Sequence, residues 1–515
     1  MTIPERKLMH SRWITAVVAL SAAIMTLDMT VVTIALPAIT GDLSANLSDA
    51  QWIVNGYVLV FAALLLGVGA LSDHMPRHRL FIAGHVIFGL ASLLCAAAPT
   101  TDWLIFGRVV QAIGATMVFA TCMPIIADAH VGDEAGRARA VGAFMAAGAG
   151  AAALGPLFGG LVVGGGGWRW IFAINLPVSL IAIVAMVLIG RHSPDTPRNP
   201  AKVSWSSTVL VAMGLFALNY ALVSGPKDGW ASATVIIAAI AAVALLAAFV
   251  ILQLRLGDDA LLDLRLFKVP SFTAAMILSF TARLVTFGVL PYLVFWLSGV
   301  QGRTAIQVGL VLLALALPMV VVAAPSSALE KTGKLNLVTG AAMVITGVGL
   351  LWLGLIMDPS LTWKTSIFPL LVIGIGAGVA MPHMMNLALA VAPADRSGAA
   401  TGATNTAFPL GTAVGVAIFG AVLSSHVDKL DWAPEQVREA ASEGRLDILA
   451  KVLDGAQLQD AIDMFTGGLS VVLLMAAGFS AVCAVICFAA IRNRDRIGDG
   501  APADADDAEP VHARR

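Results

Sequence analysis

The sequence predicts an all-helical membrane protein that crosses the bilayer fourteen times. Three observations support this fold class. The 515 residues are 58% hydrophobic and only 12% charged, whereas a soluble domain carries about 25% charged residues. Apolar runs of about twenty residues, the length that crosses the hydrocarbon layer, recur along the chain. Lys and Arg gather in alternate connections between these runs.

Fourteen apolar runs are long enough to span the bilayer. They lie at residues 13–37, 51–71, 80–98, 104–127, 138–163, 168–190, 204–224, 231–252, 271–298, 305–328, 335–356, 364–391, 402–425 and 466–491. An even number leaves both termini on one side. Most Lys and Arg residues lie on that side, so the positive-inside rule places both termini in the cytoplasm of a plasma or inner membrane.

The composition also excludes several classes of protein. A net charge of −1 argues against a nucleic-acid surface. The four cysteines lie inside apolar runs without ligand-like neighbours, so we expect neither a disulfide nor a metal. No Walker loop is present, and no paired carboxylates or Ser/His elbow occur at membrane depth. We therefore expect no cofactor, no ATP drive and no enzyme.

Asp28 lies about halfway along the first span, and no other predicted span carries an acidic side chain at such depth. A carboxylate there costs roughly 2.5–3.5 kcal/mol on insertion scales, so it normally faces the protein interior or water. Such a residue marks an ion or substrate path. The alternative is a structural polar contact between packed helices.

Glycines are concentrated in the fifth span, 138–163, around Gly155, Pro156, Gly159 and Gly160. Glycines let helix backbones approach closely in membranes, and proline kinks a helix. A close-packed, kinked helix could seal one side of a central cavity. Ordinary small-residue packing is the alternative.

The short connection 69–79 carries an acid and several bases. Asp73 could hold a neighbouring helix end, and Arg77 could pair with Asp128 at the end of the fourth span. Contacts that form in one conformation and break in another act as a gate. The alternative is a positive loop that only sets topology.

Arg108 starts the fourth span, a turn or so inside its outer boundary. It could snorkel to the surface or point inward. At 1.5 Å per residue, the depth difference from Asp28 is within reach of an arginine side chain.

These motifs resemble the major facilitator superfamily, specifically its fourteen-span branch of drug:proton antiporters. The resembling segments are 27–37, 69–79, 107–114, 142–160, 167–177 and 396–402, within residues 13–425. The first half matches more specifically. Departures include Thr33, His74, Pro76, Ala112 and Ala151, which leave the gate geometry open but not the family.

The resemblance implies two six-helix bundles with two inserted spans. The expected parts are a cytoplasmic N-tail (1–12), an N-terminal bundle (13–190), the inserted spans (191–252), a C-terminal bundle (253–491) and a disordered cytoplasmic tail (492–515). Within the C-terminal bundle, residues 426–465 are too polar to be embedded. Apolar residues recur at roughly helical spacing over Glu435–Leu453, which predicts a helical hairpin outside the bilayer. A passive lid or connector is favoured over a binding site.

The resemblance also relates Asp28 to Arg283, because the first and ninth spans occupy equivalent positions in the two bundles. Each charge lies about twelve residues into its helix, which predicts similar depth. We expect the two to approach each other in one transport state. Alternatively, Arg283 pairs elsewhere or attracts an anionic substrate group.

Aromatic and methionine residues could form a permissive pocket for hydrophobic ligands. The candidates are Trp52, Tyr57, Phe280, Phe287, Tyr292, Trp296, Met381, Met384, Met385 and Phe408. Each could instead face lipid or belong to the core.

The resemblance and Asp28 together predict a proton-coupled efflux antiporter that works by alternating access. It would export hydrophobic, cationic drugs or toxic compounds, as a monomer in the lipid bilayer. Deprotonated Asp28 would attract the drug, a proton would release it, and Arg108 would modulate the exchange. The alternatives are an exporter of an endogenous, anionic metabolite or lipid, and a non-transporting membrane protein.

Overall fold

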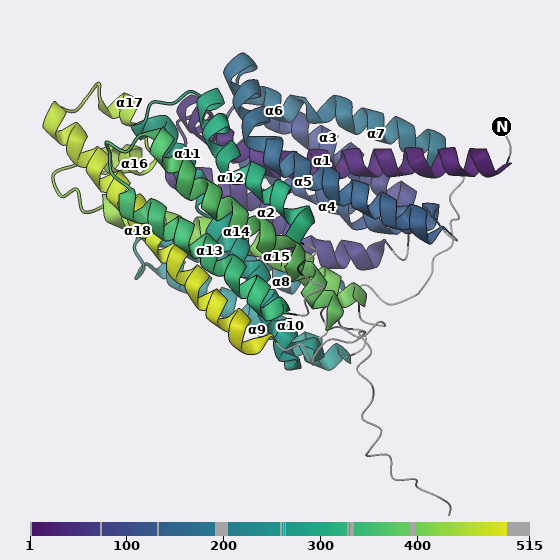
Figure 1. The fold of residues 1–515 in the computed structure, drawn as a ribbon. Coiled ribbons are helices and arrows are strands. Elements are labelled where there is room, and N and C mark those ends of the chain that lie inside the picture. The colour runs from purple at the N-terminus through teal and green to yellow at the C-terminus, as the bar shows by residue number, and fades with distance from the viewer. Residues whose placement is uncertain are drawn as a thin grey trace, which may run out of the picture.

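The computed structural model describes residues 3–72, 75–130, 133–190, 204–257, 260, 262, 264–326, 329, 334–391 and 397–491. Long helices run side by side along the molecule (Figure 1). The helices are α1 (Ile3–Leu43), α2 (Leu47–Leu71), α3 (Arg77–Ala96), α4 (Thr101–Ala129), α5 (Glu134–Gly166), α6 (Arg169–Ala173), α7 (Asn175–Gly190), α8 (Trp205–Asp228), α9 (Ala233–Leu256), η2 (Leu264–Lys268), α10 (Pro270–Phe287), α11 (Leu290–Phe295), η3 (Trp296–Val300), α12 (Ala305–Ser326), α13 (Leu335–Ile356), α14 (Trp363–Ala390), α15 (Ser397–Val427), α16 (Glu435–Ser442), α17 (Leu446–Leu449) and α18 (Gly455–Ala490).

Thirteen helical segments in the described residues are long and apolar enough to cross a membrane. α5 supplies a fourteenth if its two pieces, Arg139–Ala152 and Leu154–Gly166, count as one span bent by 49°. Pro156 explains the bend, because it has no N–H to donate to the carbonyl of Ala152 four residues earlier. The predicted fold class, with up to fourteen spans, is confirmed.

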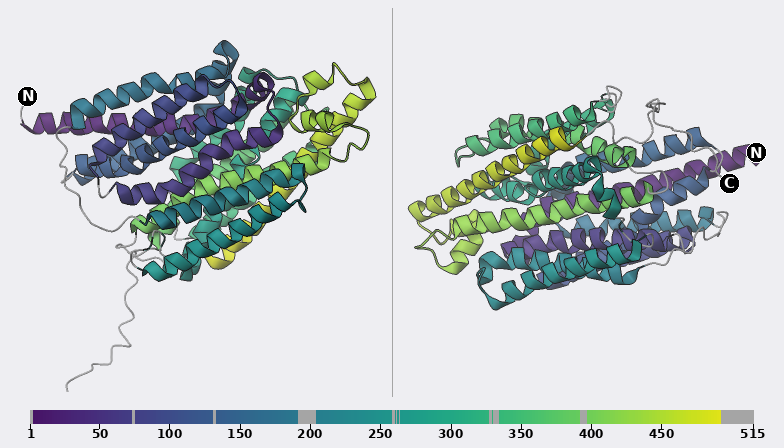
Figure 2. Two further views of the ribbon diagram at one scale, coloured as in Figure 1. Left: turned by 180° about the vertical axis from the view of Figure 1, so that it is seen from behind. Right: turned by 90° about the horizontal axis from the view of Figure 1, so that it is seen from below.

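The same packing pattern occurs twice. In the first bundle α1 packs on α4, α5 and α7, and α3 packs on α4 and α7. In the second, α10 packs on α14, α15 and α18, and α13 packs on α14 and α18. The two bundles lie side by side, and the inserted helices α8 and α9 pair with each other (Figure 2). The residue limits expected for these parts stay a prediction.

The bundles meet mainly where α5 crosses α12 and where α2 meets α15. At the first crossing, Cβ atoms built on Gly160 and Gly309 would overlap the carbonyl oxygens of Ala305 and Pro156. These glycines let the backbones touch. The crossing lies toward the end that carries α16 and α17, and the ribbons diverge toward the end that carries residue 3 (Figure 1).

The segment 426–465, for which the sequence predicts a helical hairpin over Glu435–Leu453, holds two short helices in that range, α16 and α17. α16 ends at Ser442, and Gly444 has a φ of 67°, which breaks the helix before the single turn of α17. α18 then begins at Gly455, well before the predicted span at 466. A small apolar cluster joins the segment to α15, α18 and η3; it includes Val427, Leu430, Ala441, Leu449, Ala461 and Val300. The predicted disordered tail, 492–515, lies outside the described residues.

A buried carboxylate network as the candidate functional site

Asp28 and Arg108 form an ion pair inside the first bundle. Nη1 of Arg108 lies 2.6 Å from Oδ2 of Asp28, and both side chains are 1% exposed. Arg108 therefore points inward from α4 toward α1 and does not snorkel to the surface. The helix spacing, with α1 packed against α4, brings the two residues together.

Two amide side chains complete the shell around the carboxylate. Gln111 Nε2 donates to Asp28 Oδ1 at 3.0 Å, and Asn175 Nδ2 donates to the same oxygen at 2.8 Å. Both amides also reach the hydroxyl of Ser92, at 2.8 and 3.2 Å. The network therefore joins α1, α3, α4 and α7, and both carboxylate oxygens accept hydrogen bonds.

Arg108 is fixed on several sides. Its Nη1 donates to Gln111 Oε1 at 2.6 Å, and its Nε donates to the carbonyl of Ile53 at 3.3 Å. Its Cζ lies 4.2 Å from the ring centroid of Tyr57, as in a cation–π contact. The hydroxyl of Tyr57 has no hydrogen-bond partner in the described part of the chain. These contacts hold the guanidinium of Arg108 against the carboxylate of Asp28.

Arg283 is not part of this network. Its Cζ lies 4.4 Å from the ring centroid of Phe287 and 5.5 Å from that of Phe408. Its Nε is buried without a hydrogen-bond partner in the structure as described. The predicted approach of Arg283 to Asp28 is therefore absent from this conformation, because Arg108, Gln111 and Asn175 already occupy the carboxylate.

The predicted gate residues lie in two places in the first bundle: where α3 begins beside the end of α4, and along α5. Nη1 of Arg77 lies 2.7 Å from Oδ2 of Asp128, which links the start of α3 to the end of α4. Asp73, the other residue expected at this gate, lies outside the described residues.

The glycines of α5 pack against two helices. A Cβ on Gly155 would overlap the side chain of Thr30, and one on Gly159 would lie within 3.4 Å of Val31 and Ile34, all on α1. Gly160 faces α12 in the crossing described above. The predicted close packing of this helix is present, while its role as a seal stays a prediction.

The predicted pocket residues come from helices of both bundles: α2, α10, α11, η3, α14 and α15. Trp52 stacks on Phe216 of α8, with ring centroids 6.1 Å apart. Tyr292, Trp296 and Met384 are fully buried, and Met381 is half-buried. Half-buried Phe280, Phe287 and Phe408 accompany Arg283, while the side chain of Met385 lies outside the described set. The common pocket predicted for these ten residues stays a prediction.

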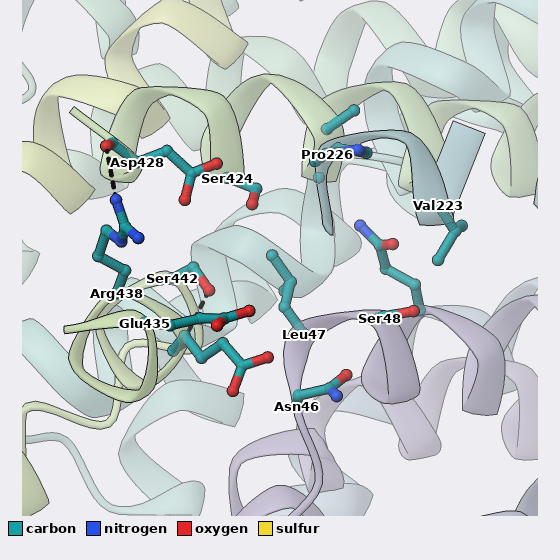
Figure 3. A pocket seen from close by; sticks show the side chains of 14 residues that line it. Asn46, Leu47, Ser48, Val223, Pro226, Ser424, Asp428, Glu435, Arg438 and Ser442 are labelled. Carbon is teal, nitrogen blue, oxygen red and sulfur yellow. Dashed lines mark hydrogen bonds between the residues drawn. The ribbon is translucent and has the colours of Figure 1, made fainter. Parts of the chain in front are cut away.

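A cavity that the sequence did not predict lies at the α16 end of the molecule (Figure 3). Its volume is about 240 Å³, and α2, α8, α15 and α16 supply its walls. Carboxylates of Asp428 and Glu435 line it, and Arg438 donates to the backbone carbonyl of Asp428 at 3.5 Å. None of the predicted site residues lines this cavity.

The sequence matches the family model of the Major Facilitator Superfamily over residues 18–416. The methylenomycin A resistance protein of Bacillus subtilis is 31% identical over 408 residues, covering 79% of this chain and 86% of that protein. The methyl viologen resistance protein SmvA of Salmonella typhimurium is 30% identical over 468 residues, covering 88% of this chain and 92% of that protein. The multidrug resistance protein Stp of Mycobacterium tuberculosis is 29% identical over 431 residues, covering 83% and 78%.

Solved structures share the fold. An inward-facing, unoccupied bacterial homolog of the human lysosomal transporter Spinster has a TM-score of 0.65 at 17% identity, covering 97% of this chain and all of that chain. A D-xylose-proton symporter has a TM-score of 0.64 at 13% identity, covering 94% and 99%. The chain therefore belongs to the major facilitator superfamily, and it is a membrane transporter and not an enzyme.

Proposed function

We propose that this protein is a proton-coupled antiporter that exports hydrophobic, drug-like compounds across the cell membrane. Its relatives are named as proteins of resistance to methylenomycin A, to methyl viologen and to multiple drugs, which supports export of small toxic compounds. The observation that carries the proton-coupled part is the buried carboxylate of Asp28, held by Arg108, Gln111 and Asn175 at the centre of the first bundle.

This geometry supplies a proton carrier whose state depends on helix packing. Three side chains on α4 and α7 donate to the two oxygens of Asp28 on α1. Small shifts between these helices would remove donors and let a proton take their place. Proton binding and helix position are then coupled, which an exchanger that alternates between two conformations requires.

The positive-inside rule places the α16 end outside the cell and the end with residue 3 in the cytoplasm. The α5–α12 crossing then closes the outer side, and the bundles diverge inward. This arrangement fits a state that loads cargo from the cytoplasm. The Arg77–Asp128 pair lies on the inner side within the first bundle and is already formed in this state, so we expect a gate there to break it in the opposite state.

The charge of the cargo depends on Asp28 and Arg283. The sequence favours cations, which Asp28 would attract. In the structure both oxygens of Asp28 are bonded, so a cation could bind there only after Arg108 withdraws. Arg283 favours the second candidate, an exporter of compounds that carry an anionic group.

The test uses purified protein in liposomes with an imposed pH gradient. We expect ethidium to move against the proton flux with the wild type and not with Asp28→Asn, measured by ethidium fluorescence and an internal pH dye. Asp42→Asn is the matched control, because Asp42 lies on the same helix and pairs with Arg169 at 2.5 Å but is 49% exposed. Exchange that survives in Asp28→Asn contradicts the proposal.

A further inference from the structure

Arg283 is a charged side chain at membrane depth that the Asp28 network does not use. Its guanidinium lies over the rings of Phe287, one turn later on α10, and Phe408 on α15. Among the described residues it forms no ion pair and no side-chain hydrogen bond. Neither ring accepts a conventional hydrogen bond, so the N–H groups of the guanidinium are left for another partner.

An arginine in this position is costly without a partner. A phenylalanine ring attracts a cation but accepts no conventional hydrogen bond, so the five N–H donors stay unsatisfied. Asp28 does not neutralise Arg283 here, because its carboxylate is already paired with Arg108 at 2.6 Å. The Asp28–Arg108 pair is neutral as a whole, which leaves Arg283 as excess positive charge.

The side chains around Arg283 are more exposed than the Asp28 network. Phe280, Arg283, Phe287 and Phe408 are all half-buried, whereas the Asp28 side chain is 1% exposed. α14, α15 and α18 cover α10 from the second bundle. The continuation of α10, α11, packs against α1 of the first bundle, so this part of the second bundle contacts the first.

We propose that Arg283, with Phe287 and Phe408, binds a carboxylate or similar anionic group on the exported compound. A guanidinium edge bonds a carboxylate through two parallel hydrogen bonds, which fits the unsatisfied donors. The rings pack against the apolar body next to that group. This inference deepens the proposed function and rests on it, because the ligand is the cargo.

Binding is tested with 1-pyrenebutyrate and its methyl ester, which differ only in the charge of the carboxyl group. Binding to the detergent-purified protein is followed by energy transfer from tryptophan to pyrene, without a proton gradient. We expect the wild type to bind the carboxylate at least tenfold more tightly than the ester. Arg283→Gln abolishes this preference while changing the Kd of the ester less than threefold.

Two variants exclude trivial causes. Arg283→Lys keeps the positive charge and should keep part of the preference. Arg303→Gln removes an arginine whose Cζ lies 5.8 Å from the Trp363 ring, between η3 and α12, and should leave the preference unchanged. A preference that persists in Arg283→Gln, or a wild type that binds both probes equally, overturns the inference.

Transport separates this inference from the proposed function. Asp28→Asn should lose gradient-driven export in liposomes but keep the binding preference for pyrenebutyrate. Arg303→Gln should keep proton-coupled export of both ethidium and pyrenebutyrate, whereas Arg283→Gln should lose export of pyrenebutyrate. If wild-type protein binds pyrenebutyrate but does not export it, Arg283 serves another anion, such as a lipid headgroup, and the cargo assignment is wrong.

Discussion

Glu443 is a buried acid outside the membrane-spanning segments, between α16 and α17. It is 3% exposed and lies 3.5 Å from Nη1 of Arg445. Burial raises its pKa to about 8, while Arg445 lowers the pKa and Glu439 and Asp49 raise it. In an unfolded segment its pKa would be about 4.3.

We expect the segment 426–465 to loosen as the pH rises. The folded segment holds a proton that the unfolded one has lost, so this stabilisation is full below about pH 4 and disappears as the pH passes about 8. Hydrogen exchange of these amides should therefore be faster in wild type than in Glu443→Gln at pH 9, and nearly equal at pH 4. The ratio of the exchange rates of the two proteins at one pH cancels the intrinsic exchange rate. If this ratio does not change with pH, burial of a protonated Glu443 does not stabilise the segment.

Some residues of the Asp28 network could be predicted from the sequence and others could not. Asp28 and Arg108 could be predicted, because charges at membrane depth are rare and helix rise gives their heights. Gln111 lies three residues after Arg108, so a shared helix face was a usable signal. Ser92 and Asn175 carried no such signal, since uncharged polar residues are common in spans and their orientation depends on packing.

At the scale of elements, the α5–α12 crossing depends on backbone contact. A methyl group on Gly309 would overlap the carbonyl of Pro156, which cannot rotate away as a side chain can. Overpacking of this kind costs about 1–3 kcal/mol. In the proposed cycle the cost falls on the state in which this crossing is formed.

Gly309→Ala should therefore open the outer side and reduce export by roughly tenfold. Pulsed electron resonance between spin labels at the outer ends of α5 and α12 should show a longer distance. Gly142→Ala is the matched control, because a Cβ there meets nothing within 4 Å. Equal distances and equal export in the two variants would show that the crossing is not a seal.

The helices themselves follow from hydrophobicity, and their ends do not. Apolar length predicted the spans, but α18 extends into the outer segment because amphipathic residues continue its helix. Helical periodicity indicated a helical hairpin over Glu435–Leu453, but it did not indicate that the turn would lie at Gly444. The spacing of apolar residues indicates which face of a helix is buried, but it does not indicate where the backbone turns.

At the scale of the molecule, α8 joins both bundles. Asn55 on α2 donates to Asn219 on α8 at 2.9 Å and to the carbonyl of Ala413 on α15 at 3.3 Å. Gln51, one turn earlier, bonds Tyr292 of the second bundle at 2.9 Å. The fold class could be predicted from hydrophobicity and motifs, but this lateral connection could not, because it depends on how separate bundles lie together.

Asn219→Leu should lower the free energy of unfolding by about 1–3 kcal/mol, since it removes the acceptor for a buried amide. Thermal unfolding of the purified protein in detergent measures this effect. Tyr220→Phe is the control, because the neighbouring tyrosine is 39% exposed and its change should leave the melting temperature unaltered. A leucine variant as stable as the control would mean that α8 is only loosely attached.

The placement of α8 also limits how this chain can be engineered. Excising the α8–α9 pair to make a minimal twelve-span transporter would strip a hydrogen-bonded flank from α2 and α15. The Asn55 amide would then meet acyl chains, and the truncated protein would need a compensating apolar replacement at that position before it could insert stably.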